Sequence, residues 1–131
     1  MRYIYIYTTP SAEVDGILKV GDAMNVEKRI KEQLNTAASF HQDSLNYSLL
    51  YQTPAIKNDG TPFKDHDIHS ILEYKNYHRR KITKGNEVLK GSTEWFEIEK
   101  EKVISLIEQF KAGKKKEEIE IERFLDFPMR P

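Results

Sequence analysis

The sequence predicts an α+β fold, in which helices pack on a small, mainly antiparallel sheet of three strands. Three observations lead to this fold class. Residues 3–9 are Tyr, Ile and Thr without a break, which is the composition of a β-strand. A short connection separates them from a second apolar segment at residues 17–21, so an antiparallel hairpin is expected. Three later segments have the apolar spacing of amphipathic helices.

The expected order is strand, strand, helix, strand, helix, an optional short strand, and helix. Residues 10–16 carry Pro, Ser, Asp and Gly and are predicted to form a loop. Asn25 is typical of a helix N-cap. An apolar residue at every fourth position extends that helix to about residue 38, through Val26, Ile30 and Leu34.

The second half of the chain supplies one more strand and two more helices. Residues 45–53 alternate like a strand, and a turn at 57–62 leads to a helix with an apolar stripe at Ile68, Ile71 and Leu72. Residues 78–92 lack periodicity and are predicted to be a long surface loop. A short aromatic segment follows at 93–98. Residues 99–110 form the last helix, buried through Val103, Ile104, Ile107 and Phe110.

Composition excludes several classes of protein. The chain of 131 residues has no cysteine, which excludes a disulfide scaffold, a cysteine zinc site and a thiol nucleophile. Its 21 Lys and Arg balance 21 Asp and Glu, so only a local basic patch is available to hold phosphates. Apolar runs are far shorter than the roughly 20 residues that span a bilayer. We therefore expect a cytoplasmic protein that does not contact a membrane.

From residue 111 onward the sequence becomes highly charged. This change predicts a domain over residues 1–111, followed at 112–131 by a charged linker and the start of a following region.

Five short motifs follow one another in a fixed order. Ile4-Tyr5 lies in the first strand, Lys19-Val20-Gly21 ends the second, and Arg29 lies eight positions further on, after Asn25. Asp65 precedes His69 by four positions, and Glu94-Trp95-Phe96 lies in the short aromatic segment. Over residues 2–98 this series resembles the GIY-YIG nuclease superfamily, in the branch with a Lys-(Ile/Val)-Gly second motif and a Glu-Trp-Phe signature.

The resemblance implies a DNA endonuclease that depends on Mg²⁺ or Mn²⁺. Its catalytic residues would be Tyr5, Lys19, Arg29 and His69, and its metal ligand would be Asp65. Tyr5 suits a general base or a hydrogen-bond partner of water, if a nearby cation lowers its pKa from about 10. Arg29 offers a planar fork to two phosphate oxygens. We expect Tyr5, Lys19, Arg29 and Asp65 to converge on one concave face.

Two departures from the superfamily pattern support a second hypothesis. Gln33 stands where the superfamily commonly has a histidine, and an amide cannot take a proton. Asp65 is one methylene shorter than the usual glutamate. The alternative is a catalytically weak DNA-binding module that targets an attached helicase.

Structural interpretations of the same residues stay open. Tyr3, Tyr5 and Tyr7 also fit one face of a sheet. Arg29 also fits a surface position on the helix beside Glu32. Asp65 also fits a negative charge at a helix N-terminus, where the helix dipole favours it. Trp95 and Phe96 are interpreted as core residues, and Glu94 as either a support for the site or an exposed residue. His66 and His69 lack a third ligand at a suitable spacing, so zinc is not expected.

A basic cluster marks the predicted DNA contact. Six basic residues stand between positions 75 and 90 against one acid. They fit an arm that holds the DNA backbone, although a solvated loop has the same composition. The predicted DNA-binding residues are Arg79, Arg80, Lys81 and Lys84, together with Lys28 and Lys31 on the first helix.

The C-terminal residues 124–131 give a separate indication. An aromatic residue followed by Arg-Pro resembles the start of the first motif of superfamily-two helicases. This resemblance implies that the chain is the N-terminal piece of a longer helicase-type protein, of restriction or repair type.

Overall fold

A four-stranded antiparallel sheet organises the protein. In the computed structural model, which describes residues 1–38, 46–77, 79, 83–84, 87–88 and 94–121, the strand order is β3-β1-β2-β6. The strands are β1 (Tyr3–Thr8), β2 (Ile17–Ala23), β3 (Ser48–Pro54) and β6 (Trp95–Glu97). The α+β class and the antiparallel pairing are confirmed.

The optional short strand of the predicted order forms, so the sheet has four strands instead of three. The aromatic segment near residue 95 returns to the free edge of β2 and pairs with it, with Leu18 opposite Phe96. This pairing supplies hydrogen-bond partners to the backbone of β2, which would otherwise be an open edge. Trp95 and Phe96 are both buried, which confirms their interpretation as core residues.

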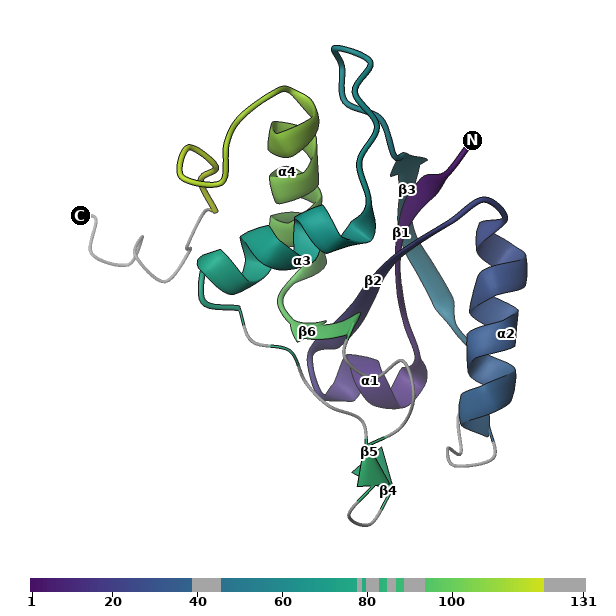
Figure 1. The fold of residues 1–131 in the computed structure, drawn as a ribbon. Helices are drawn as coiled ribbons and strands as arrows, with labels where there is room; N and C mark the ends of the chain where they lie inside the picture. Colours follow the sequence, from purple (N-terminus) through teal and green to yellow (C-terminus); the bar gives the residue numbers. More distant parts are fainter. Residues whose placement is uncertain (39–45, 78, 80–82, 85–86, 89–93, 122–131) are drawn as a thin grey trace, which may run out of the picture.

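Helices cover both faces of the sheet (Figure 1). On one face, α2 (Val26–Ala38) packs against the side chains of Tyr5 and Tyr7. On the other face, α3 (Asp65–Tyr74) and α4 (Lys100–Lys111) pack against Ile4 and Ile6. Because side chains alternate along a strand, β1 contributes to two separate apolar clusters.

Residues 10–16 are partly helical, against the predicted loop. The short helix α1 (Pro10–Val14) begins with Thr9 as N-cap, and the Thr9 hydroxyl accepts a hydrogen bond from the backbone N–H of Ala12. Pro10 occupies the first turn, where a missing N–H costs nothing. Proline at this position therefore starts a helix instead of breaking one.

Part of the predicted surface loop is a small hairpin. It consists of β4 (Thr83–Lys84) and β5 (Glu87–Val88), which pair with each other and form a separate two-stranded sheet. The remainder of 78–92 lies outside the described residues, apart from Arg79.

The core also receives a side chain from beyond residue 111. Ile119 is fully buried in the cluster beneath α3 and α4, and the Gln109 side chain bonds the backbone of Glu120. The domain boundary near residue 111 stays a prediction. Residues 122–131, which carry the helicase resemblance, lie outside the described part. None of the described helices has the length and apolar character required to cross a membrane.

Gly21 is required by the close approach of Tyr5. The two residues are cross-strand partners in the β1–β2 register. A Cβ atom at position 21 would lie 2.5 Å from the Tyr5 hydroxyl oxygen and 2.6 Å from the ring carbon Cζ. The absence of a side chain at position 21 therefore lets the Tyr5 ring lie over β2.

We predict that Gly21→Ala lowers the free energy of unfolding by about 1–3 kcal/mol, because the Tyr5 ring must move away from the added methyl group. Chemical denaturation measures this loss, and near-ultraviolet circular dichroism reports the tyrosine environment. Gly16→Ala is the control, since nothing lies within 4 Å of a Cβ there and its cost arises from a positive φ. A Gly21→Ala protein with wild-type stability and spectrum would contradict the packing argument.

Candidate active site

A polar cleft of about 540 Å³ opens between α2, the end of β2 and the start of α3. Six of its lining residues bear on chemistry, namely Tyr5, Asp22, Arg29, Gln33, Asp65 and Glu94. Three of the four residues expected to converge are among them. The fourth, Lys19, reaches the cleft through its ion pair with Glu94. Their convergence is thus a property of the fold, whereas their roles stay predictions.

Tyr5 is buried at the base of the site. Its hydroxyl group donates a hydrogen bond to Oε1 of Gln33 at 3.3 Å. Burial raises the pKa of Tyr5 well above its ordinary value, and the Gln33 hydrogen bond and the Arg29 charge oppose this only in part. The expectation of a lowered pKa is therefore wrong, because the desolvation of the phenolate outweighs the nearby cation. At neutral pH Tyr5 is a neutral hydrogen-bond donor.

Gln33 joins two tyrosines. Its Oε1 also accepts a hydrogen bond from the Tyr7 hydroxyl at 3.1 Å, and the Tyr5 and Tyr7 rings stack with centroids 6.0 Å apart. An amide oxygen has two lone pairs, whereas a neutral imidazole has a single acceptor nitrogen. The amide at position 33 therefore fits two phenols that both donate.

Lys19 is a buried ammonium group with one carboxylate partner among the described residues. Its Nζ lies 3.4 Å from Oε1 of Glu94, which precedes β6. Burial lowers the pKa of Lys19, and the adjacent Glu94 charge acts in the opposite direction. Glu94 is half-buried and lines the cleft, which excludes a fully exposed position, whereas its support of the site stays a prediction.

Arg29 projects from the first turns of α2. The side chain of Asn25 accepts a hydrogen bond from the backbone N–H of Lys28 at 3.1 Å, which confirms the predicted N-cap. The Arg29 side chain is 53% exposed and lies 4.0 Å from a Glu32 oxygen, so it is a cleft residue beside Glu32. Lys28 lines the same cleft, whereas Lys31 pairs with Glu27 at 2.8 Å.

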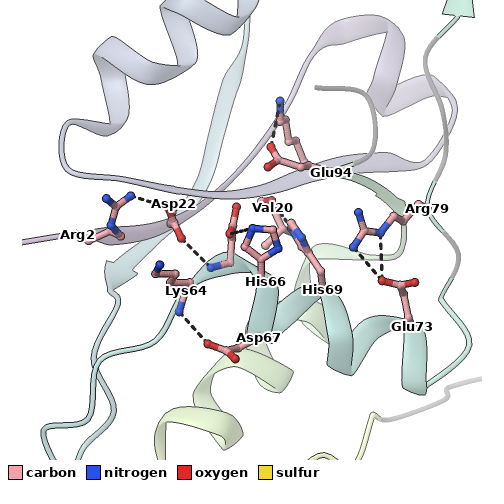
Figure 2. Close-up of polar contacts among 12 residues, drawn as sticks. Arg2, Val20, Asp22, Lys64, His66, Asp67, His69, Glu73, Arg79 and Glu94 are labelled. Atoms are coloured by element: carbon pink, nitrogen blue, oxygen red, sulfur yellow. Dashed lines mark hydrogen bonds and ion pairs between the residues drawn. The ribbon is translucent and has the colours of Figure 1, made fainter. Parts of the chain in front are cut away.

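Asp65 begins α3 beside a second carboxylate. The backbone N–H of Asp65 donates to Oδ2 of Asp22 at 2.8 Å, and Arg2 pairs with Asp22 at 2.7 Å (Figure 2). Burial, followed by the negative charges of Asp22 and Glu94, raises the pKa of Asp65 to about 7. A buried carboxylate among other carboxylates fits a ligand of a divalent cation, because the ion would offset its charge.

His69 lies one helical turn beyond Asp65 and is buried beneath the cleft. Its Nε2 is 2.7 Å from the Val20 carbonyl oxygen, and its ring packs against Phe96 with centroids 5.3 Å apart. Burial lowers the pKa of His69, so the ring is neutral at physiological pH. Its predicted catalytic role stays a prediction. His66 is exposed, with Nε2 3.8 Å from an Asp65 oxygen.

The predicted DNA-binding arm is described only in part. Arg79 pairs with Glu73 at 2.9 Å (Figure 2). It also lies over the Phe96 ring. Lys84 belongs to β4, and Arg80 and Lys81 lie outside the described residues. DNA binding by this arm stays a prediction.

Most of the chain matches a known protein family. A model of the T5orf172 domain matches residues 2–111, a range that includes every residue lining the cleft. The chain belongs to the T5orf172 domain family. T5orf172 domains are nuclease-type domains, so the protein is a nuclease-like or DNA-binding module. Searches of curated proteins and of solved structures returned no match.

Sequence reasoning misses two residues of this T5orf172 site. Asp22 is not among the predicted site residues, although it directly follows the Lys-Val-Gly motif and bonds the start of α3. Tyr7 is predicted only as part of one face of the sheet. The signal for Tyr7 is present, because Tyr5 and Tyr7 are two positions apart on one strand and must point the same way.

Replacing Gln33 with Leu should destabilise the T5orf172 domain. Leu is similar in size but leaves two buried phenol groups without their shared acceptor, at an expected cost of about 1–3 kcal/mol. Chemical denaturation of a double-mutant cycle with Tyr7→Phe provides the test. Loss of the Tyr7 hydroxyl should cost less in the Gln33→Leu background than in the wild type. Strictly additive costs would show that the two residues are not coupled.

The raised pKa of Asp65 predicts a pH-dependent gain in stability for Asp65→Asn. A carboxyl whose pKa is higher in the folded state than in the unfolded chain loses stability as pH rises between the two values. In a chelating buffer, Asp65→Asn should melt several degrees above the wild type at pH 8 (roughly the shift for 1–2 kcal/mol). The difference should shrink toward pH 5.

Asp59→Asn is the matched control for this measurement. Asp59 is exposed, and its pKa is lowered by a hydrogen bond from Thr61, so removing its charge should not stabilise the fold. If Asp65→Asn and the wild type had the same melting temperature at pH 8, ionisation of Asp65 would not destabilise the folded state, and the prediction would be wrong.

Proposed function

We propose that this T5orf172 domain is a divalent-metal-dependent DNA endonuclease of the GIY-YIG type. One observation carries the proposal. Tyr5 from β1, Arg29 from α2 and Asp65 from α3 line one cleft, and Lys19 from β2 is paired with the cleft residue Glu94. Hydrolysis of a phosphodiester needs a positioned water, positive charge at the phosphate oxygens and help for the leaving oxygen. The cleft contains side chains suited to each requirement.

Arg29 is the residue best suited to the phosphate. Its guanidinium group is half-exposed at the wall of the cleft and is held by a long contact of 4.0 Å to Glu32. A planar fork of donors can bind two phosphate oxygens at once, and the charge opposes the negative charge that develops on them. Lys28 lines the cleft one position earlier, where it can hold a neighbouring phosphate.

Tyr5 and Lys19 would act as fixed polar groups beneath the reacting phosphate. The raised pKa of Tyr5 favours the role of hydrogen-bond donor over that of general base. Its single O–H is donated to Gln33, so it must turn from the amide oxygen to a substrate oxygen when one arrives. Lys19 supplies positive charge from a buried position, where the effective dielectric constant is low.

Asp65 would hold the metal. Its carboxylate is buried beside Asp22, and this donor set of oxygens suits Mg²⁺ or Mn²⁺ with retained waters. When bound, such an ion supplies Lewis-acid charge near the phosphate. Asp22 would keep Asp65 in place through the hydrogen bond to its backbone, while Arg2 balances the Asp22 charge.

Plasmid nicking and single-turnover cleavage test the proposal. With Mg²⁺ or Mn²⁺ the wild type should cleave DNA, and Arg29→Ala should lower the cleavage rate by about 100-fold or more. Lys102→Ala is the control, because Lys102 lies on α4, pairs with Glu99 and does not line the cleft. Circular dichroism checks that both variants fold.

A catalytically weak DNA-binding module is the second candidate function. Gln33 favours it, since an amide cannot transfer a proton. DNA binding without cleavage under either metal would support this module, and undiminished cleavage by Arg29→Ala would refute the assigned role of Arg29.

A further inference from the structure

Three side chains at the start of α3 form a cluster of metal-ligand type. Asp65, His66 and His69 each offer one ligand atom, and these atoms lie within 4.8 Å of one another. Helical geometry places His69 one turn from both Asp65 and His66, so its ring lies next to each of them along the helix surface. An inward movement of the ligand atoms would bring them around a single ion.

The hydrogen bonding of His69 leaves one nitrogen without a partner. A carbonyl oxygen can only accept, so the contact of 2.7 Å to Val20 places the ring proton on Nε2. Nδ1 then carries a lone pair. This nitrogen is buried, in a residue that is 1% exposed, and it has no hydrogen-bond partner among the described residues.

Such a lone pair is unusual in a folded protein. Buried polar atoms almost always have a partner, and leaving one unpaired is unfavourable. A histidine that donates one ring N–H to a backbone carbonyl is also the common arrangement behind a metal-binding imidazole, because that bond fixes the tautomer. The Val20 contact therefore prepares His69 as a ligand.

His66 can complete the group without disturbing the fold. Its side chain is 81% exposed, and its Nε2 lies 3.8 Å from an Asp65 oxygen. The His66 and His69 rings approach edge to face, with centroids 5.9 Å apart. An exposed imidazole is free to turn toward an ion next to Asp65.

We propose that Asp65, His66 and His69 bind a divalent transition-metal ion that accepts imidazole ligands, such as Zn²⁺ or Co²⁺. The ligands would be one carboxylate oxygen and two imidazole nitrogens, which leaves a coordination position for water or a phosphate oxygen. This inference rests on the proposed function in using Asp65 as a metal ligand. It goes further by naming the nitrogen ligands and the class of ion. The sequence shows no third ligand at a spacing typical of zinc sites. The structure supplies that ligand in Asp65, which directly precedes His66.

Metal binding to the full chain, without DNA, tests the inference. After treatment with a chelator and its removal, the protein is titrated with Co²⁺ and followed by calorimetry and visible absorption. We expect one ion per chain and the absorption bands of nitrogen-coordinated Co²⁺. His66→Ala should weaken Co²⁺ binding by about tenfold or more while leaving any Mg²⁺ binding unchanged.

The matched control is Asp67→Asn. Asp67 lies on the same helix, but its carboxylate accepts a hydrogen bond from the backbone N–H of Lys64 and is not part of the cluster. Asp67→Asn should bind Co²⁺ like the wild type. The His66 side chain is exposed, so His66→Ala should fold like the wild type, and a change in Co²⁺ affinity would report the loss of a ligand.

The outcomes separate this inference from the proposed nuclease activity. Co²⁺ binding that depends on Asp65 but not on His66 would overturn the inference and leave a carboxylate-only metal site for the nuclease. No binding of Co²⁺ or Zn²⁺ would also overturn it. Binding that depends on His66, in a protein that cleaves no DNA, would support the inference while the proposed function fails.

Discussion

The architecture depends on the burial of β1 on both faces and its pairing on both edges. β1 bonds to β2 and β3, so its backbone is satisfied without water. Its alternate side chains then contribute to two apolar clusters, with Ile4 and Ile6 on one side and Tyr5 and Tyr7 on the other. The two tyrosines carry hydroxyl groups into a buried layer, and a polar site must form there to receive them. The cleft is therefore built into the packing of β1.

Local signals predict the elements well. The alternation of residues 3–8, the cap at Asn25 and the apolar stripes of the helices each depend on neighbours within one turn or one strand. The elements that the sequence misses, such as α1, or leaves optional, such as β6, depend on single contacts. The helix α1 forms around the Thr9 cap, and β6 becomes a strand only because β2 offers it a free edge.

In the candidate site, too, residues in local motifs are predictable, whereas residues that act through long-range contacts are not. The motif residues Tyr5, Arg29 and Asp65 are found by spacing and line one cleft. Gln33 and Asp22 act through partners that are 28 and 43 positions away in the sequence, and no local pattern reports such contacts. The protonation of Tyr5 escapes prediction for a related reason. The sequence indicates a nearby cation but cannot measure how completely the ring is removed from water.

Opposite charges alternate across the cleft. The carboxylates Asp22 and Glu94 have cationic partners in Arg2 and Lys19. Among the described residues, the exposed His66 is the only ion-pair partner of Asp65. The negative charges of Asp22 and Glu94 disfavour the ionisation of Asp65. Functional sites often keep such unfavourable arrangements at a cost in stability.

The shortness of β6 has a consequence for cooperativity. β6 pairs with β2 over three residues at the edge of the sheet, and Glu94 directly precedes it. With so few backbone pairs, β6 is held in place largely by the burial of Trp95 and Phe96. When β6 detaches, Lys19 loses its counter-ion and the Trp95 ring leaves Tyr7. The charge balance of the cleft is therefore coupled to the burial of two aromatic side chains at this edge of the sheet.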